Sequence, residues 1–209
     1  MYLRKSEVWE LVHAERHHLI DDLTDLPRDA WETPTACRNW TVHDVLAHQL
    51  DTAATGKWAF IWSMMRAKGD FDQTNIDGIQ RCKRDDPHDT LADYQAIAHY
   101  RRIPTAHRAT RLVEVYLHGE DIRRPLGITG SYPAEGVHDA LTYQLRTPTW
   151  FGGGRERAAG YRLIDSATGA AWGEGIEVTG AAIDLFLAVS GRPVSAELLD
   201  GPGAAQLVG

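Results

Sequence analysis

The amino-acid sequence predicts a mainly α-helical protein that ends in a small α/β module. Before residue 127, apolar residues recur every three or four positions in several long stretches, which is typical of amphipathic helices. Beyond residue 149, short apolar segments alternate with glycines, which favours strands and turns. With 209 residues, 43% of them hydrophobic, the chain can bury a substantial core. We therefore expect an up-down four-helix bundle over residues 1–148 and a small α/β module over residues 149–209.

The helices of the bundle follow from apolar spacing and from capping residues. Thr41 and Asp44 form a near capping box at the start of the second helix, which we expect to continue past Gly56. The polar, glycine-containing segment after it, residues 68–89, is predicted to be a long connection that lies over a site. The four predicted helices cover about residues 6–23, 42–66, 90–100 and 106–123.

The C-terminal part of the chain has a different sequence pattern. One more helix is predicted over residues 134–145, and the glycine-rich segment 147–160 marks the expected domain boundary. Residues 161–180 are predicted to form two short strands around a turn, followed by a helix over residues 181–191.

Charge and composition exclude several classes of protein. The net charge is −7 and the arginines are scattered, so there is no basic patch for nucleic acid. No apolar run approaches the roughly 20 residues that a membrane span needs, and the N-terminal residues lack the apolar core of a secretory signal. Cys37 and Cys82 form no CxxC pair, so no thiolate zinc cluster is expected. We expect a cytoplasmic protein without nucleic-acid or membrane partners.

One stretch combines an apolar face with candidate ligands. In RLVEVYLHGED, residues 111–121, Glu114, His118 and Asp121 share one face of the predicted helix. An i, i+4 pair can present two ligands to one metal ion, and His48, on an apolar helix face, is a candidate third. Three protein ligands would leave the open position of a catalytic zinc site. The alternative is a buried His–Glu–His hydrogen-bond network without metal.

Other candidate motifs are weaker. His13 and His17 are also four residues apart, but they fall on a face that we expect to be solvated. The run FGGGRE, residues 151–156, lacks the P-loop pattern and is interpreted as a hinge. Cys37, just before a helix start, is interpreted as a packing residue. The serines lie in no GxSxG context.

Two segments together resemble a known family. CRNWTVHDVLAHQL, residues 37–50, followed far downstream by RLVEVYLHGEDIRRPLG, residues 111–127, is similar to the metal-binding helical domain of the mycothiol-dependent maleylpyruvate isomerase family, which belongs to the wider group of DinB-like four-helix bundles. The resemblance implies a metal bound by His48, Glu114 and His118.

The tail carries a second resemblance. GEGIEVTGAAIDLFLAVSGRP, residues 173–193, is similar to the C-terminal module of this family, a small α/β piece often compared with sterol-carrier domains. The region after residue 150 is short for a complete second domain, so any substrate contact that this module makes in the family is left open here.

The resemblance implies a thiol-dependent reaction at a divalent metal, with zinc as the expected ion and mycothiol as the expected low-molecular-weight thiol. The thiolate would add to a small electrophile of the maleylpyruvate type, either for cis–trans isomerisation or for permanent S-transfer. The alternative is a non-catalytic, metal-stabilised protein that binds a small ligand. The particular substrate and the oligomeric state are left open.

Charged residues near the metal helix are the remaining catalytic candidates. Arg111, Arg123 and Arg124 could pair with a substrate carboxylate, although a solvated helix end is the alternative for all three. Asp121 could orient a ligand imidazole, or it could be an exposed carboxylate at the helix end. We take Arg111, Asp121 and Arg123 as candidate catalytic residues.

Overall fold

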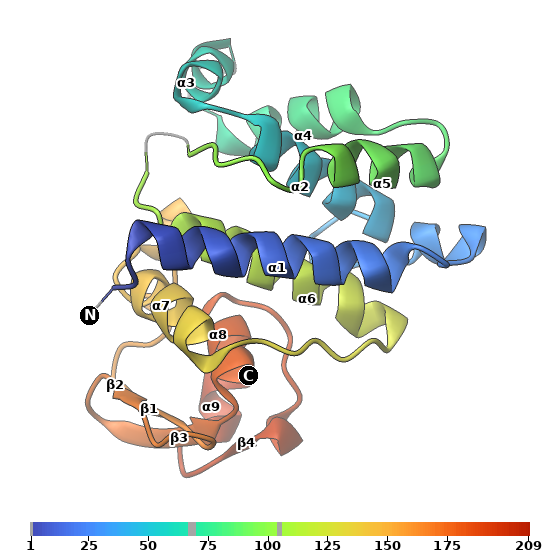
Figure 1. Cartoon of the computed structure of the whole chain (residues 1–209). Coiled ribbons are helices and arrows are strands. Elements are labelled where there is room, and N and C mark those ends of the chain that lie inside the picture. The colour runs from blue at the N-terminus through green and yellow to red at the C-terminus, as the bar shows by residue number, and fades with distance from the viewer. Residues whose placement is uncertain (1, 67–69, 104–105) are drawn as a thin grey trace. The chain divides into compact units, whose positions relative to one another are not determined.

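The computed structural model describes residues 2–66, 70–103 and 106–209, and it divides into two compact units (Figure 1). One unit is Arg4–Ser131. The other contains Tyr132–Gly209 and the N-terminal residues up to Leu3. The prediction of a mainly α protein with a small C-terminal α/β part is confirmed. Among the described residues, no helix is long and apolar enough to cross a membrane.

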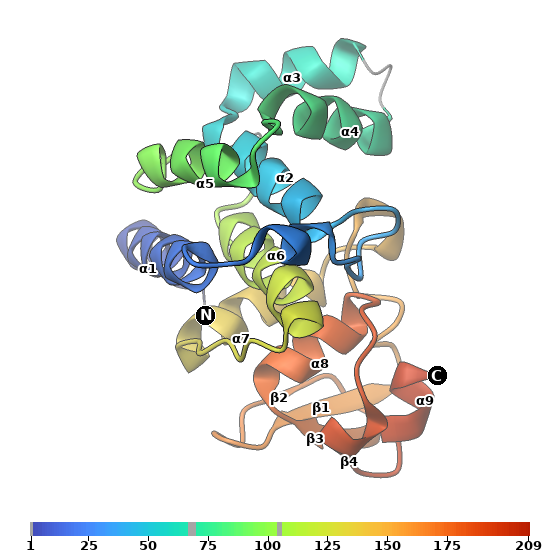
Figure 2. The ribbon, with the colours of Figure 1, turned by 90° about the vertical axis from the view of Figure 1, so that its right-hand side faces the viewer.

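The named elements in the described part of the unit Arg4–Ser131 are all helices (Figure 2). Four of its helices surround a common core: α1 packs against α5 and α6, and α2 packs against the same two helices. Trp31, Leu46 and Tyr94 are fully buried in that core. The helices of this unit are α1 (Lys5–Leu23), α2 (Val42–Ala54), α3 (Lys57–Arg66), α4 (Phe71–Cys82), α5 (Pro87–Ala96) and α6 (Thr110–Leu126), with a short 3-10 helix at Arg28–Glu32.

The bundle helices do not simply alternate in direction. His43 near the start of α2 contacts Thr90 near the start of α5, with Nε2 and Oγ1 2.8 Å apart. Further along both helices, the Tyr94 hydroxyl donates to Gln49. The helices α2 and α5 therefore run in the same direction, because the connection between them, which contains α3 and α4, returns the chain to the end where α2 begins.

The second predicted helix is two helices in the structure. Thr55 has an extended backbone, and α3 begins after Gly56. The prediction of one helix through Gly56 was wrong because glycine weakens a helix interior and Thr55 is β-branched.

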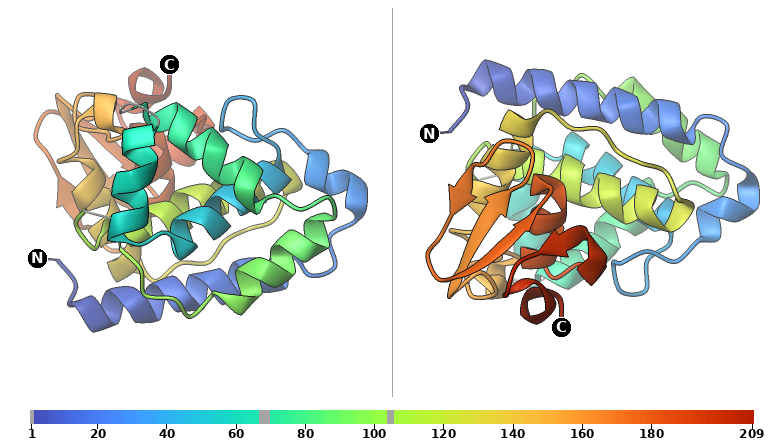
Figure 3. Two further views of the ribbon diagram at one scale, coloured as in Figure 1. Left: turned by 90° about the horizontal axis from the view of Figure 1, so that it is seen from above. Right: turned by 90° about the horizontal axis from the view of Figure 1, so that it is seen from below.

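The predicted connection over residues 68–89 is largely helical. Lys68 and Gly69 lie outside the described residues, but α4 occupies Phe71–Cys82 and is capped by Asp70. Its polar sequence hid the helix, since few of its side chains are buried. The helix α4 lies against α2 (Figure 3). Gly78 permits this close approach, because a Cβ at this position would lie inside van der Waals contact with the carboxylate of Asp51.

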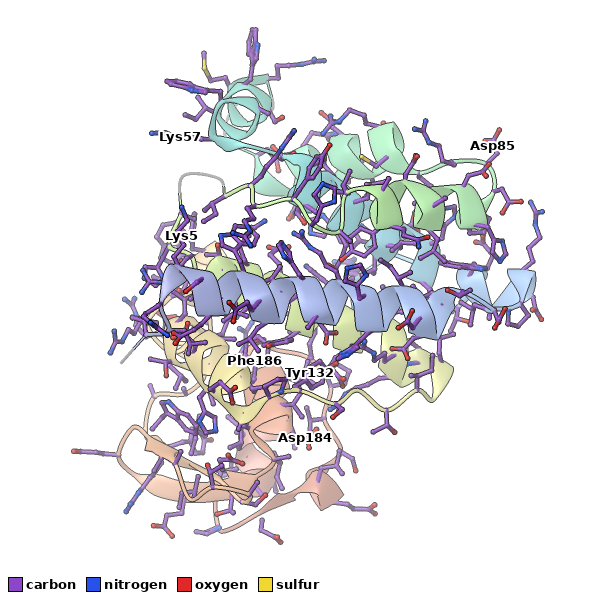
Figure 4. All side chains as sticks on the ribbon, in the orientation of Figure 1. Lys5, Lys57, Asp85, Tyr132, Asp184 and Phe186 are labelled. Atoms are coloured by element: carbon purple, nitrogen blue, oxygen red, sulfur yellow. The ribbon has the colours of Figure 1, made fainter. Side chains whose placement is uncertain are left out.

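The unit that contains Tyr132–Gly209 has helices on a four-stranded sheet. The strand order is β2-β1-β3-β4, with β1 and β3 parallel and both edge strands antiparallel to their neighbours. α8 packs on β1 and β3, and α7 packs on α8; Figure 4 labels Asp184 and Phe186 on α8. The elements are α7 (Ala134–Gln144), β1 (Tyr161–Asp165), β2 (Ala171–Trp172), β3 (Ile176–Gly180), α8 (Ala182–Val189), β4 (Leu199–Asp200) and α9 (Ala204–Val208).

The division between the units differs from the boundary predicted at residues 148/149. The predicted boundary lies inside the C-terminal unit, because α7 is tied to the sheet. His138 of α7 contacts Asp165 of β1 at 2.8 Å, and Trp172 of β2 donates to Thr142 at 2.9 Å. The glycine-rich run that suggested a hinge is packed within this unit, where Gly153 lies against the backbone of Thr147.

We expect Thr41→Ala to lower the free energy of unfolding by about 1 kcal/mol. Thr41 is the N-cap of α2: its hydroxyl accepts from the backbone of Asp44, and the Asp44 carboxylate accepts from the backbone of Thr41 at 2.9 Å. Urea unfolding monitored by circular dichroism would measure the change. Thr41→Ser keeps the hydroxyl and is the matched control. Equal midpoints for the alanine and serine variants would contradict a capping role.

Candidate metal centre

The packing of α2 against α6 brings three predicted ligands together. The two helices are antiparallel, since His48 lies opposite Glu114 and, one turn further along α2, the Thr52 carbonyl accepts from Arg111. His48 Nε2 is 3.6 Å from Glu114 Oε2, and His118 Nε2 is 3.8 Å from the same oxygen. One ligand atom from each of His48, Glu114 and His118 lies within 4.8 Å of the others.

These separations suit a shared ion better than direct hydrogen bonds. A good N–H···O hydrogen bond spans about 2.7–3.2 Å, and both distances exceed this range. Tetrahedral ligands at about 2.1 Å from a zinc ion lie about 3.4 Å apart. The two imidazole nitrogens thus lie close to this spacing from the Glu114 oxygen.

Two buried polar atoms of this cluster lack hydrogen bonds. Within the described residues, Glu114 Oε2 and His48 Nδ1 are buried without a hydrogen-bond partner. The His48 ring packs against the ring of Trp40, with centroids 5.1 Å apart, and meets the ring of His118 edge-on at 4.8 Å. Because a buried carboxylate oxygen without a partner is destabilising, a cation beside it would offset that cost. The residues present therefore fit a divalent metal.

The charges of the cluster are strongly coupled. Burial alone would raise the pKa of Glu114, but the contact with His48 and the charges of His118 and Arg111 hold this pKa well below its usual range. Burial lowers the pKa of His48, more than Glu114 raises it. Burial opposes charge on His118 too, but Asp121, Cys37 and Glu114 raise its pKa to about 10. The carboxylates thus favour positive charge between α2 and α6.

Asp121 contacts the other nitrogen of the His118 ring. Its Oδ2 is 3.0 Å from His118 Nδ1, and its side chain is almost completely buried. The alternative of an exposed carboxylate at the helix end does not hold for this residue. A carboxylate in this place fixes the ring orientation and directs Nε2 toward Glu114.

Sequence reasoning missed the position of Cys37. Its Sγ donates to Asp121 Oδ2 at 3.1 Å and lies 3.9 Å from His118 Nδ1. With His118 and Asp121 it forms the second of two groups in the described residues that could hold a metal. The only signal in the sequence was its place just before the turn, closed by Trp40, that leads into α2.

The predicted arginines occupy different environments. Arg111 is buried near Glu114, donates to the Thr52 carbonyl at 3.2 Å, and has an Nε without a hydrogen-bond partner in the described part of the chain. Arg123 lies on another face of α6, where it donates to Glu15 and Asp22 of α1. The structure therefore brings Arg111, but not Arg123, to the cluster.

The competing histidine pair remains separate from this cluster. His17 is exposed, as expected, while His13 is half-buried against Trp9, with ring centroids 5.7 Å apart. Neither belongs to a group of potential metal ligands within the described residues.

Part of the helical unit matches a known family model. Residues 12–109 match the family model described as the mycothiol maleylpyruvate isomerase N-terminal domain. The match includes His48 and ends shortly before Glu114 and His118 of α6.

Two solved structures share the fold of the whole chain. A crystal structure of the mycothiol-dependent maleylpyruvate isomerase superposes with a TM-score of 0.67 at 15% identity, and covers 97% of this chain and 94% of the other. A histidine-to-alanine mutant of that isomerase gives a TM-score of 0.62 at 13% identity, with the same coverage. No curated protein sequence matches the chain. The shared fold thus covers both the helical part and the C-terminal α/β part of this chain.

We expect the purified chain to bind about one divalent ion, and His48→Ala, Glu114→Ala and His118→Ala each to lose it, because each removes one of three ligands. Elemental mass spectrometry would measure metal content, and circular dichroism would show that the helices persist. His17→Ala, an exposed histidine of α1, is the control and should keep the ion. A wild-type chain that cannot be loaded with zinc, or an alanine variant with full metal content, would contradict this ligand set.

Arg123→Met should destabilise the fold by about 3–5 kcal/mol without removing the metal. The change leaves the buried carboxylate of Glu15 without its partner, and Glu15→Gln in the same chain should recover part of the loss. Urea unfolding and metal content of the folded fraction would be measured together. If folded Arg123→Met lost its metal while His17→Ala kept it, the result would show that Arg123 contributes to metal binding.

Proposed function

We propose that this chain is a thiol-dependent enzyme that acts at a divalent metal on a small electrophile of the maleylpyruvate type. The observation that carries the proposal is the buried Glu114 oxygen without a hydrogen bond, flanked by His48 and His118. The match to the maleylpyruvate isomerase N-terminal domain supports the same reading. The thiol that we propose is mycothiol, which the family description names.

His48, Glu114 and His118 are the residues that would hold the metal. Two imidazoles and one carboxylate are typical zinc ligands, and three protein ligands leave a position for an exchangeable group. When bound, the metal and a low-molecular-weight thiol together supply a thiolate that can add to an activated double bond and then leave, or remain on the electrophile.

Asp121 and Cys37 prepare His118 for its role. In our proposal, His118 donates its Nδ1 proton to Asp121 Oδ2, which leaves the lone pair of Nε2 directed at the ligand cluster. The Cys37 thiol donates to the same carboxylate oxygen. With two donors on one oxygen, the Asp121 carboxylate is held in place, and the ring of His118 with it.

Arg111 has two roles in this proposal. Its buried charge helps to keep Glu114 ionised, as a metal ligand must be. Its Nε, which has no hydrogen-bond partner within the described residues, makes it the arginine that we propose for pairing with a substrate carboxylate. Arg123 is not needed for this step because it is engaged by Glu15 and Asp22.

Neither protein thiol needs to act as the nucleophile. Within the described residues, neither Cys37 nor Cys82 forms a disulfide, which suits the cytoplasm that the sequence predicts. Burial and the nearby Asp51 raise the pKa of Cys82 to about 11, so its thiol is protonated at neutral pH. The nucleophile in our proposal is the thiol that binds from solution.

The test is turnover of maleylpyruvate by zinc-loaded protein with and without mycothiol. Thiol-dependent appearance of the trans isomer would show isomerisation, and a stable thioether product would show S-transfer. Glu114→Ala should abolish either reaction, while His17→Ala should retain it. A chain that binds metal and small ligands but converts none of them with any thiol would favour the non-catalytic binding protein instead.

The Asp121→Asn variant should still bind the metal, but with lower affinity. We expect metal affinity to fall by about 10–100-fold, because the amide is a weaker acceptor for the His118 ring. Competition with a chelator would measure the affinity. Glu120→Gln, a buried carboxyl one residue away that accepts from Arg124, is the matched control. Equal metal affinity in Asp121→Asn and wild type would mean that Asp121 does not orient a ligand.

A further inference from the structure

A hollow lies on the unit Arg4–Ser131, between α2, α3 and α4. Its volume is ≈ 750 Å³, which is within the range that holds a small organic ligand. None of His48, Glu114 and His118 is among the residues that line it. This hollow, which we call the α3 cleft, is lined in part by Asp51, Thr55, Trp62, Arg66 and Arg81.

One wall of the α3 cleft is aromatic. Trp62 lines the cleft and is 66% exposed, so its indole presents an uncovered flat surface. Trp58, one turn earlier on α3, is also exposed but does not line the cleft. Figure 4 shows long side chains standing away from α3 beside the label of Lys57. An indole of this kind favours a planar apolar group that can stack on it.

The charged groups of the α3 cleft are unbalanced. Arg81 donates to Asp51, so these two side chains satisfy one another. Arg66 makes no ion pair or hydrogen bond within the described residues, and α3 carries no acidic residue in its first turn. The thiol of Cys82 is neutral, because burial raises its pKa to about 11. The cleft therefore offers one uncompensated positive charge on a chain whose net charge is −7.

We propose that the α3 cleft binds a small aromatic carboxylate, with its ring stacked on Trp62 and its carboxylate at Arg66. A guanidinium pairs with a carboxylate through two parallel hydrogen bonds, and the ring replaces water on the indole. The site is separate from the metal ligands, so this inference does not depend on the proposed function.

The probe is 2-naphthoate, and isothermal titration with the full-length, zinc-loaded chain measures its binding. Trp62→Leu and Arg66→Gln should each weaken binding about fivefold or more. Trp58→Leu and Lys57→Gln, on the same helix but not among the lining residues, are matched controls that should stay within about twofold of wild type. The neutral 2-naphthamide should bind wild type more weakly than 2-naphthoate and should be insensitive to Arg66→Gln. All four substitutions are on exposed positions, so metal content should be unchanged.

Several results would overturn the proposal. Absence of naphthoate binding would do so directly. Equal losses for Trp58→Leu and Trp62→Leu would mean adsorption on the exposed face of α3. Loss of naphthoate binding in His118→Ala, or after the metal is removed, would place the carboxylate at the metal. Binding of the chain to vesicles of phosphatidylglycerol and phosphatidylcholine, in the absence of naphthoate binding, would assign the α3 surface to a lipid partner instead.

Discussion

The packing of α2 against α6 is the constraint on which the candidate site depends. Antiparallel helices in contact place residues four apart on one helix against a single position on the other, and here His48 meets Glu114 and His118. Neither helix could hold this cluster alone. The site is therefore as well formed as the core beneath it, in which Leu46 of α2 and Ile122 of α6 are fully buried.

The polar groups between these helices form one connected system. Glu114 lies between two imidazoles, His118 joins Glu114 to Asp121, and Asp121 accepts from Cys37. Such a network is stable only if its charges are balanced, because the surroundings exclude water. The carboxylates of Glu114 and Asp121 are offset by the charge of Arg111 and by a proton on His118, and the contacts with these carboxylates contribute to the raised pKa of that ring. Position and charge thus favour the same occupant, a metal cation.

The sequence could predict those parts of this arrangement that follow from helical periodicity. Helical spacing placed Glu114 and His118 on one face of a helix, and the apolar residues around His48 indicated a buried imidazole. Only the resemblance to a known family joined the three residues into one predicted ligand set. Cys37 could not be placed in this way, because its contact with Asp121 joins a turn to a helix 84 residues away. The helix α4 was missed since its polar sequence resembles a loop, and the unit boundary was misplaced since only contacts between side chains tie α7 to the sheet.

The absence of a side chain at Gly78 affects which ligands the α3 cleft can admit. Because α4 rests on α2 at that position, a single methyl group would displace the carboxylate of Asp51, which lines the α3 cleft, and so alter the shape of the cleft. None of the metal-cluster residues lines the α3 cleft: His48 lies on α2 and contacts Glu114, and Glu114 and His118 lie on α6. Substitution at one small residue could therefore tune which molecules enter the cleft, while the chemistry between α2 and α6 is inherited unchanged.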